Sequence, residues 1–80
     1  MERDKLLEQV NDIFRDVLDN ESLQLTDATT AHDVERWDSL THIHIIIALE
    51  RKFGIRFTSR EIQSWENVGE MIDCLSTKIG

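Results

Sequence analysis

The stretch Trp37-Asp38-Ser39-Leu40 marks the point where a polar segment changes into the most hydrophobic run of the chain, which continues to Phe53. Aspartate is a favoured N-cap residue because its carboxylate accepts hydrogen bonds from amides that the first helical turn leaves unpaired. Asp38 therefore predicts a helix start with Ser39 on the first turn. A hydroxyl there can carry a phosphate ester, whose charge the free amides and the helix dipole would stabilise together. The position suits a covalent modification.

The predicted helix has apolar residues on two opposite sides. Each residue advances about 100° around an α-helix, which places one set on an inner stripe: Ile45, Ile46, Leu49 and Phe53. A second set begins beside Ser39 and forms an outer stripe: Leu40, Ile43 and Ile47. Such a helix is either buried on both sides or has a face that binds a partner. Because the chain has only 80 residues, we expect an exposed docking face.

The two histidines of this helix differ in position. His42 falls within the inner stripe, and we expect it at the edge of the core with a hydrogen-bond partner. His44 projects near the outer stripe. They are about 200° apart around the helix and cannot chelate one ion, and no cluster of cysteines or carboxylates completes a zinc site. We predict no metal site, and a Ser-His-Asp triad at Ser39 lacks any sign of an oxyanion hole or substrate cleft.

The segments before this helix predict a helix and a long loop. Apolar residues at steps of three and four indicate an amphipathic helix: Leu6, Leu7, Val10, Ile13, Phe14, Val17 and Leu18. From Asp19 to Asp38 no helical period survives. A loop of this length needs anchors in a small domain, and we expect four apolar residues to supply them: Leu23, Leu25, Val34 and Trp37.

After this helix, the chain predicts one short and one longer helix. Gly54 provides a C-terminal stop, and Thr58 with Glu61 has the spacing of a capping box that opens a short helix to about Ser64. Two residues of this region should turn inward: Ile62 and Trp65. The last helix opens with a second cap pair, Asn67 and Glu70, and its apolar stripe is Val68, Met71, Ile72, Leu75 and Ile79. The fold class is all-α.

Length and charge set the outer bounds. The 80 residues make a single domain, 1–80, no apolar run can span a bilayer, and the start lacks the order of a signal peptide. Of the net charge of −7, all arises before Ser39, since residues 39–80 hold five side chains of each sign. This balance disfavours nucleic acid and anionic membrane as partners. The lone Cys74, which we interpret as a packing residue, fits a reducing cytoplasm. We expect a cytoplasmic monomer.

Asp38-Ser39-Leu40, followed by Ile43, Ile47, Ala48-Leu49-Glu50 and Phe53, resembles the signature of acyl carrier proteins. In that family the serine is esterified by 4′-phosphopantetheine, whose thiol carries an acyl chain as a thioester. The resemblance runs from the first helix to the last and implies a small four-helix bundle, with three main helices, a short one and a long first loop. It also implies attachment at Ser39, carriage rather than catalysis, and two kinds of partner: a phosphopantetheinyl transferase, and acyl-loading and acyl-processing enzymes.

The resemblance implies partner recognition by residues along the second helix: Asp38, Leu40, Ile43, His44, Ile47, Glu50 and Arg51. Carriers that serve fatty acid synthesis usually have several acidic side chains there, whereas this chain offers Thr41, His44 and Arg51 and keeps only Glu50. Trp37 also replaces a residue that is small in many members. These departures favour a specialised lipid, polyketide or other secondary pathway.

Two alternatives remain open at this point. An aminoacyl or peptidyl carrier would usually show a Gly-rich stretch before the serine, which Arg36-Trp37-Asp38 does not match. A small helical interaction module could use the outer stripe without any prosthetic group. Attachment of phosphopantetheine separates both kinds of carrier from such a module.

Overall fold

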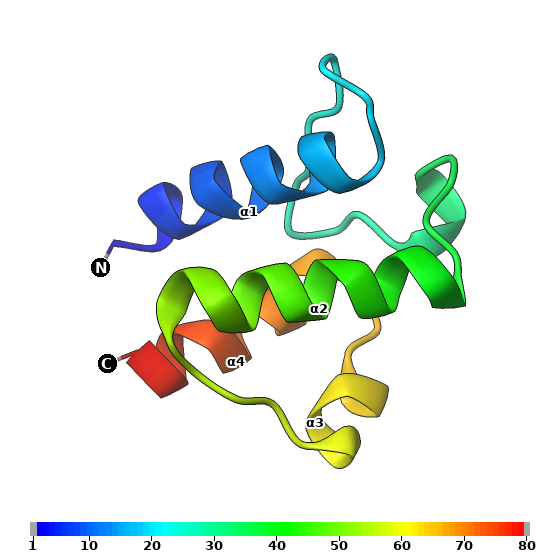
Figure 1. Cartoon of the computed structure of the whole chain (residues 1–80). Helices are drawn as coiled ribbons and strands as arrows, with labels where there is room; N and C mark the ends of the chain where they lie inside the picture. Colours follow the sequence, from blue (N-terminus) through cyan, green and yellow to red (C-terminus); the bar gives the residue numbers. More distant parts are fainter. Residues whose placement is uncertain (1, 80) are drawn as a thin grey trace.

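Four α-helices and one short 3-10 helix make up residues 2–79, the part of the chain that this computed structural model describes. Their order is α1 (Arg3–Val17), η1 (Ala31–Asp33), α2 (Ser39–Phe53), α3 (Ser59–Ser64) and α4 (Val68–Ile79). Figure 1 shows α2 running antiparallel beneath α1, with α4 below and partly behind α2 and α3 at one edge. The predicted all-α fold, with three main helices, a short helix and a long first loop, is confirmed.

The core forms where the apolar stripes of α1, α2 and α4 meet. The buried apolar residues of these helices are Leu6, Val10, Phe14, Ile45, Ile46, Leu49, Val68, Met71, Ile72 and Leu75. Burial of these side chains is the main favourable contribution to folding, because apolar surface leaves water. Three of the four inner-stripe residues of α2 are therefore in the core, while Phe53 is partly buried and packs against it.

The long loop between α1 and α2 is held by its predicted anchors. Leu25 and Val34 are buried, and Leu23 and Trp37 are partly buried against the core. The buried side chain of Asn11 accepts a hydrogen bond from the Leu25 amide at 2.7 Å. An amide that enters the core thereby keeps a partner, which a buried backbone group needs. The loop is thus fixed to α1 rather than free.

The helix η1 is a turn that the sequence analysis did not predict. Both the amide and the hydroxyl of Thr30 donate to Oδ2 of Asp33, at 3.0 and 3.2 Å. No residue of η1 is buried, so the sequence shows no apolar periodicity that would predict this turn. Local hydrogen bonding alone defines this turn.

The loop also reaches the start of α4. The amides of Val68 and Gly69 donate to the carbonyls of Thr29 and Asp27, each at 2.9 Å. A Cβ on Gly69 would lie 2.9 Å from the Asp27 carbonyl oxygen. Glycine is therefore required here by the close approach of two backbone segments. This contact brings the loop and α4 together on the side of the molecule where α2 begins.

The helix ends follow the sequence signals. Gly54 ends α2 in the left-handed region, at φ 64°, which glycine adopts without strain. The predicted capping box at α3 is present, since the Thr58 hydroxyl accepts from the Glu61 amide and the Glu61 carboxylate accepts from the Thr58 amide. At α4, Oδ1 of Asn67 accepts from the Glu70 amide at 2.9 Å.

Candidate functional site

The start of α2 is built as the sequence predicts. Oδ1 of Asp38 accepts from the amides of Leu40 and Thr41, both at 3.0 Å, and the Asp38 amide donates to the Thr41 hydroxyl at 2.8 Å. These bonds, with the Thr41 amide first, hold the pKa of the Asp38 carboxyl below its usual value. Asp38 thus remains an ionised cap, and Ser39 is the first residue of the helix.

The turn before this cap is also locked in place. The Thr41 hydroxyl donates to the Arg36 carbonyl at 2.6 Å, and Arg36 itself has a positive φ of 69°. A non-glycine residue adopts that conformation only when its surroundings determine it. The hydrogen bond from Thr41 therefore fixes where the loop ends and where Ser39 begins.

Ser39 presents its side chain at the surface. The residue is exposed, and within residues 2–79 its hydroxyl makes no hydrogen bond. The amides of Leu40 and Thr41 are taken by Asp38, as the predicted cap requires. The Ser39 amide has no hydrogen-bond partner among residues 2–79. The helix dipole remains as a favourable influence on a charge at this position.

A cavity of about 310 Å³ opens beside Ser39. Residues from the first loop, α2, the α3–α4 connection and α4 line it: Ala31, Trp37, Asp38, Ser39, His42, Trp65, Glu66, Asn67 and Met71. The sequence pattern predicts an inward Trp65 and a core Met71 but connects neither residue with Ser39. No sequence spacing could do so, since this neighbourhood arises only when α4 packs against α2 and the loop.

Five aromatic rings form a continuous series of contacts that includes part of the cavity lining. Consecutive ring centroids lie 4.8 Å (Phe14 to Trp37), 5.8 Å (Trp37 to His42), 6.2 Å (His42 to Trp65) and 4.9 Å (Trp65 to Phe57) apart. Three of these four contacts are edge-to-face, the arrangement that the charge distribution of aromatic rings favours. Three rings of the series line the cavity, Trp37, His42 and Trp65, and the other two support them from the sides.

His42 has the hydrogen-bond partner that the sequence analysis predicts. Nε1–H of Trp37 donates to Nδ1 of His42 at 2.9 Å. This bond requires Nδ1 to be unprotonated, and burial lowers the pKa of His42 from its ordinary value of 6.5. Trp37 thus packs on Phe14 and positions His42.

The outer stripe of α2 is exposed as predicted. Leu40, Ile43 and Ile47 expose 63%, 54% and 41% of their surface, and these are the exposed large hydrophobic residues of the described chain. His44 and Arg51 are exposed beside them. Glu50 differs, since it is partly buried and its Oε2 accepts from the Phe57 amide at 2.9 Å. It therefore also fixes the connection between α2 and α3.

Three other kinds of feature concern metal binding, membrane insertion and the reactivity of Cys74. Within residues 2–79 no group of three His, Cys, Asp or Glu side chains could hold a metal ion, and none of the helices there is long and apolar enough to cross a membrane. The Cys74 thiol donates to Oε2 of Glu61 at 3.5 Å, and burial is the main cause that raises its pKa. A raised pKa keeps this thiol protonated and poorly nucleophilic.

A family model described as a phosphopantetheine attachment site matches residues 8–75. An acyl carrier protein of Petrotoga mobilis is 30% identical over 80 residues, covering 99% of this chain and 93% of the relative. The chain belongs to the acyl carrier protein family. As a member it carries covalently attached phosphopantetheine, and it works with partner enzymes such as synthases and transferases.

Two further matches extend this result. A holo acyl carrier protein from Geobacter metallireducens, solved by NMR, has a TM-score of 0.88 and 39% identity, with 92% of this chain and 85% of that one covered. A polyketide-8 synthase acyl carrier protein from Streptomyces avermitilis is 29% identical over 73 residues, covering 91% of this chain and 84% of the relative. The all-helical acyl carrier fold is thus shared over most of the length.

Proposed function

We propose that Ser39 receives the 4′-phosphopantetheine group and that the protein carries an acyl chain as a thioester on the thiol of that arm. The observation that carries this proposal is the exposed Ser39 hydroxyl, without a hydrogen-bond partner among residues 2–79, at the mouth of a 310 Å³ cavity with aromatic walls. A free hydroxyl is accessible to a transferase. The arm supplies the thiol, and the chain's own residues position the serine.

The helix start that holds Ser39 is fixed, whereas the arm attached to it would be free to move in solvent. Asp38 and Thr41 keep the first turn of α2 in one conformation. Because Asp38 occupies the amides of Leu40 and Thr41, these two amides do not hold a phosphodiester on Ser39, which lies at the exposed surface. A solvated tether raises the local concentration of its thioester at any active site on which the domain docks. The protein thus presents the acyl group and leaves catalysis to its partners.

The outer stripe, with Asp38, His44, Glu50 and Arg51 around it, is proposed as the surface that partner enzymes recognise. Leu40, Ile43 and Ile47 form one apolar line that begins beside Ser39. Exposed apolar lines with a polar rim are typical of protein interfaces. A transferase or acyl-processing enzyme that covers this line brings its active site close to the arm.

The pathway is proposed to be a specialised one in the cytoplasm, such as polyketide or modified lipid synthesis. The support is the charge of α2, where Thr41, His44 and Arg51 stand at positions at which carriers for fatty acid synthesis usually have acidic residues. A basic docking surface would meet the positive charge of Arg51 on α2, and this like charge disfavours its approach to that helix.

The test is intact mass after incubation with a broad-specificity phosphopantetheinyl transferase and coenzyme A. The natural sequence should gain one phosphopantetheine, and Ser39→Ala should gain none. Ser59→Ala is the matched control, since Ser59 is also an exposed first helical residue behind a cap. It should load at the natural rate. No mass gain in the natural sequence would instead favour an interaction module, and loading of Ser39→Ala would refute the assigned site.

A further inference from the structure

The ten residues 51–60 have a charge opposite to that of the whole chain. They contain four basic side chains and no acidic one: Arg51, Lys52, Arg56 and Arg60. The other seventy residues hold five basic and all sixteen acidic side chains. A protein with a net charge of −7 therefore has a locally positive surface at the end of α2 and in the connection to α3.

These four basic side chains lack ionic partners within residues 2–79. Elsewhere in that range, Arg3 pairs with Asp27 and Asp73, Arg15 lies 3.3 Å from Asp12, and Lys78 lies 2.9 Å from Glu61. The acidic residue nearest in sequence, Glu50, uses Oε2 to accept from the Phe57 amide. The positive charge at the end of α2 is thus available to a molecule outside the chain.

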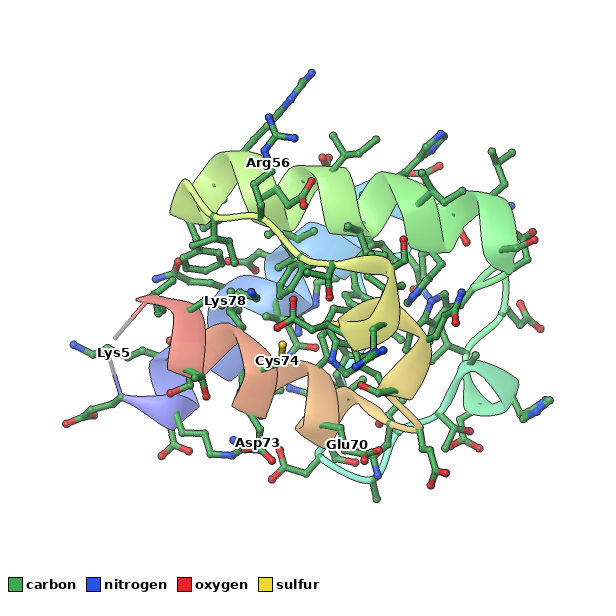
Figure 2. All side chains as sticks on the ribbon, turned by 90° about the horizontal axis from the view of Figure 1, so that it is seen from below. Lys5, Arg56, Glu70, Asp73, Cys74 and Lys78 are labelled. Carbon is green, nitrogen blue, oxygen red and sulfur yellow. The ribbon has the colours of Figure 1, made fainter. Side chains whose placement is uncertain are left out.

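Two of these arginines share a groove with apolar side chains. The groove, of about 340 Å³, is lined by Ile47, Glu50, Arg51, Gly54, Ile55 and Arg56, and we call it the basic groove. Ile47 also ends the outer stripe, so the two surfaces are continuous. At Gly54 no atom lies within 4 Å of the place where a Cβ would stand. Figure 2 shows Arg56 directed outward beside α2.

We propose that the basic groove receives a partner protein's apolar side chain flanked by carboxylates, so that the docking surface of the partner is acidic. This inference rests on the proposed role of the outer stripe in docking. Ile47 and Ile55 would contact the apolar side chain, while Arg51 and Arg56 bind the carboxylates. Guanidinium groups match carboxylates in planar, two-bond geometry, and charge complementarity sets both encounter rate and partner choice.

A protein fits these observations better than an anionic membrane does. The basic charge surrounds a groove with two isoleucines rather than covering a flat face. A flat lipid surface would leave these two isoleucines uncovered, whereas a partner's side chain can enter the groove and contact them.

The test measures binding of two peptides to the phosphopantetheinylated protein by amide chemical-shift titration. One is an amphipathic helical peptide with Leu and Glu, and the other has each Glu replaced by Lys. The acidic peptide should bind about tenfold more tightly, with its shifts concentrated at residues 47–56, and added salt should reduce the difference. Equal binding of the two peptides, or tighter binding of the basic one, would overturn the proposal.

Charge-reversal variants locate the effect. Arg56→Glu should weaken binding of the acidic peptide about tenfold, and Arg51→Glu with Arg56→Glu should reverse the preference. Lys5→Glu is the matched control, since it makes the same charge change on an exposed residue of α1 that Figure 2 places far from Arg56. It should leave binding within about twofold. An equal loss in Lys5→Glu, or tighter binding to phosphatidylglycerol vesicles than to the peptide, would contradict an acidic protein partner.

Mass spectrometry tests phosphopantetheine attachment at Ser39 independently of peptide binding at the basic groove. Arg51 lies twelve residues beyond Ser39, about 18 Å along the helix axis. The charge variants should therefore retain the natural circular dichroism spectrum and still gain phosphopantetheine. If the natural sequence gained none, and the unmodified protein still preferred the acidic peptide, the proposed function would fall and the groove would stand. If it loaded normally and showed no peptide preference, the groove assignment would be wrong.

Discussion

Two helix starts in this molecule have nearly the same local design. At α2 the order is Trp37-Asp38-Ser39, and at α3 it is Phe57-Thr58-Ser59, so that an aromatic residue, a cap and an exposed serine follow one another in each. Both caps accept hydrogen bonds from amides of the first turn and complete a capping box. Both aromatic rings belong to the same series of ring contacts.

The surroundings of the two serines differ. Ser39 lies at a cavity and is followed by the exposed Leu40, whereas Ser59 is followed by Arg60 on a six-residue helix that buries none of its residues. The pKa of Glu61 in that short helix falls to about 2, chiefly through the bond from the Thr58 amide and then through Lys78. Capping chemistry thus creates an accessible serine at both helix starts, whereas the cavity and the outer stripe adjoin Ser39, where we propose that the arm is attached.

The largest expected effect comes from the ring contacts beneath the two starts. Phe14 is fully buried against Trp37, so Phe14→Ala should cost about 3–5 kcal/mol, much of the stability of a small domain. Trp65, which contacts Phe57, is only partly buried, and Trp65→Ala should cost less. Urea denaturation of both variants gives the measurement. A smaller loss of stability in Phe14→Ala than in Trp65→Ala would show that the α2 start is not the one fixed to the core.

A smaller effect is expected from the cap of α3. Thr58→Ala removes the acceptor for the Glu61 amide and should lower the free energy of unfolding by about 1 kcal/mol. Because the change is local to α3, phosphopantetheine loading should proceed at the natural rate. Denaturation midpoints and loading rates are measured on the same samples. Loss of loading in this variant would mean that the two helix starts depend on each other.

The smallest expected effect is a pH dependence of stability that arises from His42, on α2. The pKa of folded His42 lies below its ordinary value of 6.5, so just below about pH 6.5 the unfolded chain takes up a proton that the folded chain does not. The contribution of His42 to stability is thus complete above that pH and declines as the pH falls toward the folded pKa. The melting temperature should therefore fall between about pH 7.5 and pH 5.5.

Two variants separate His42 from the other histidines. His42→Gln keeps an acceptor for the Trp37 indole but cannot titrate in this range, and it should flatten the decline. The exposed His44→Gln should retain it. If both variants kept the full slope, a different group would be responsible for the pH dependence.

The helices were predictable because their signals are local. Asp38, Gly54 and the Thr58–Glu61 pair mark helix ends by capping chemistry, and the spacing of Leu40, Ile43 and Ile47 showed which side of α2 stays exposed. The cavity beside Ser39 was not predictable, since Trp65 and Met71 reach it only through packing between distant segments. The hydrogen bond that Glu50 accepts from the Phe57 amide was not predictable for the same reason.

The central claim is that Ser39, and not its counterpart Ser59, carries the arm. Trypsin cleaves after Lys and Arg, which leaves Ser39 as the single serine of a peptide covering residues 37–51 and Ser59 in a peptide covering residues 57–60. Tandem mass spectrometry of the loaded, digested protein should place one phosphopantetheine on the first peptide, with fragment ions assigning it to Ser39. A modification on residues 57–60, or on Thr41, would contradict the account.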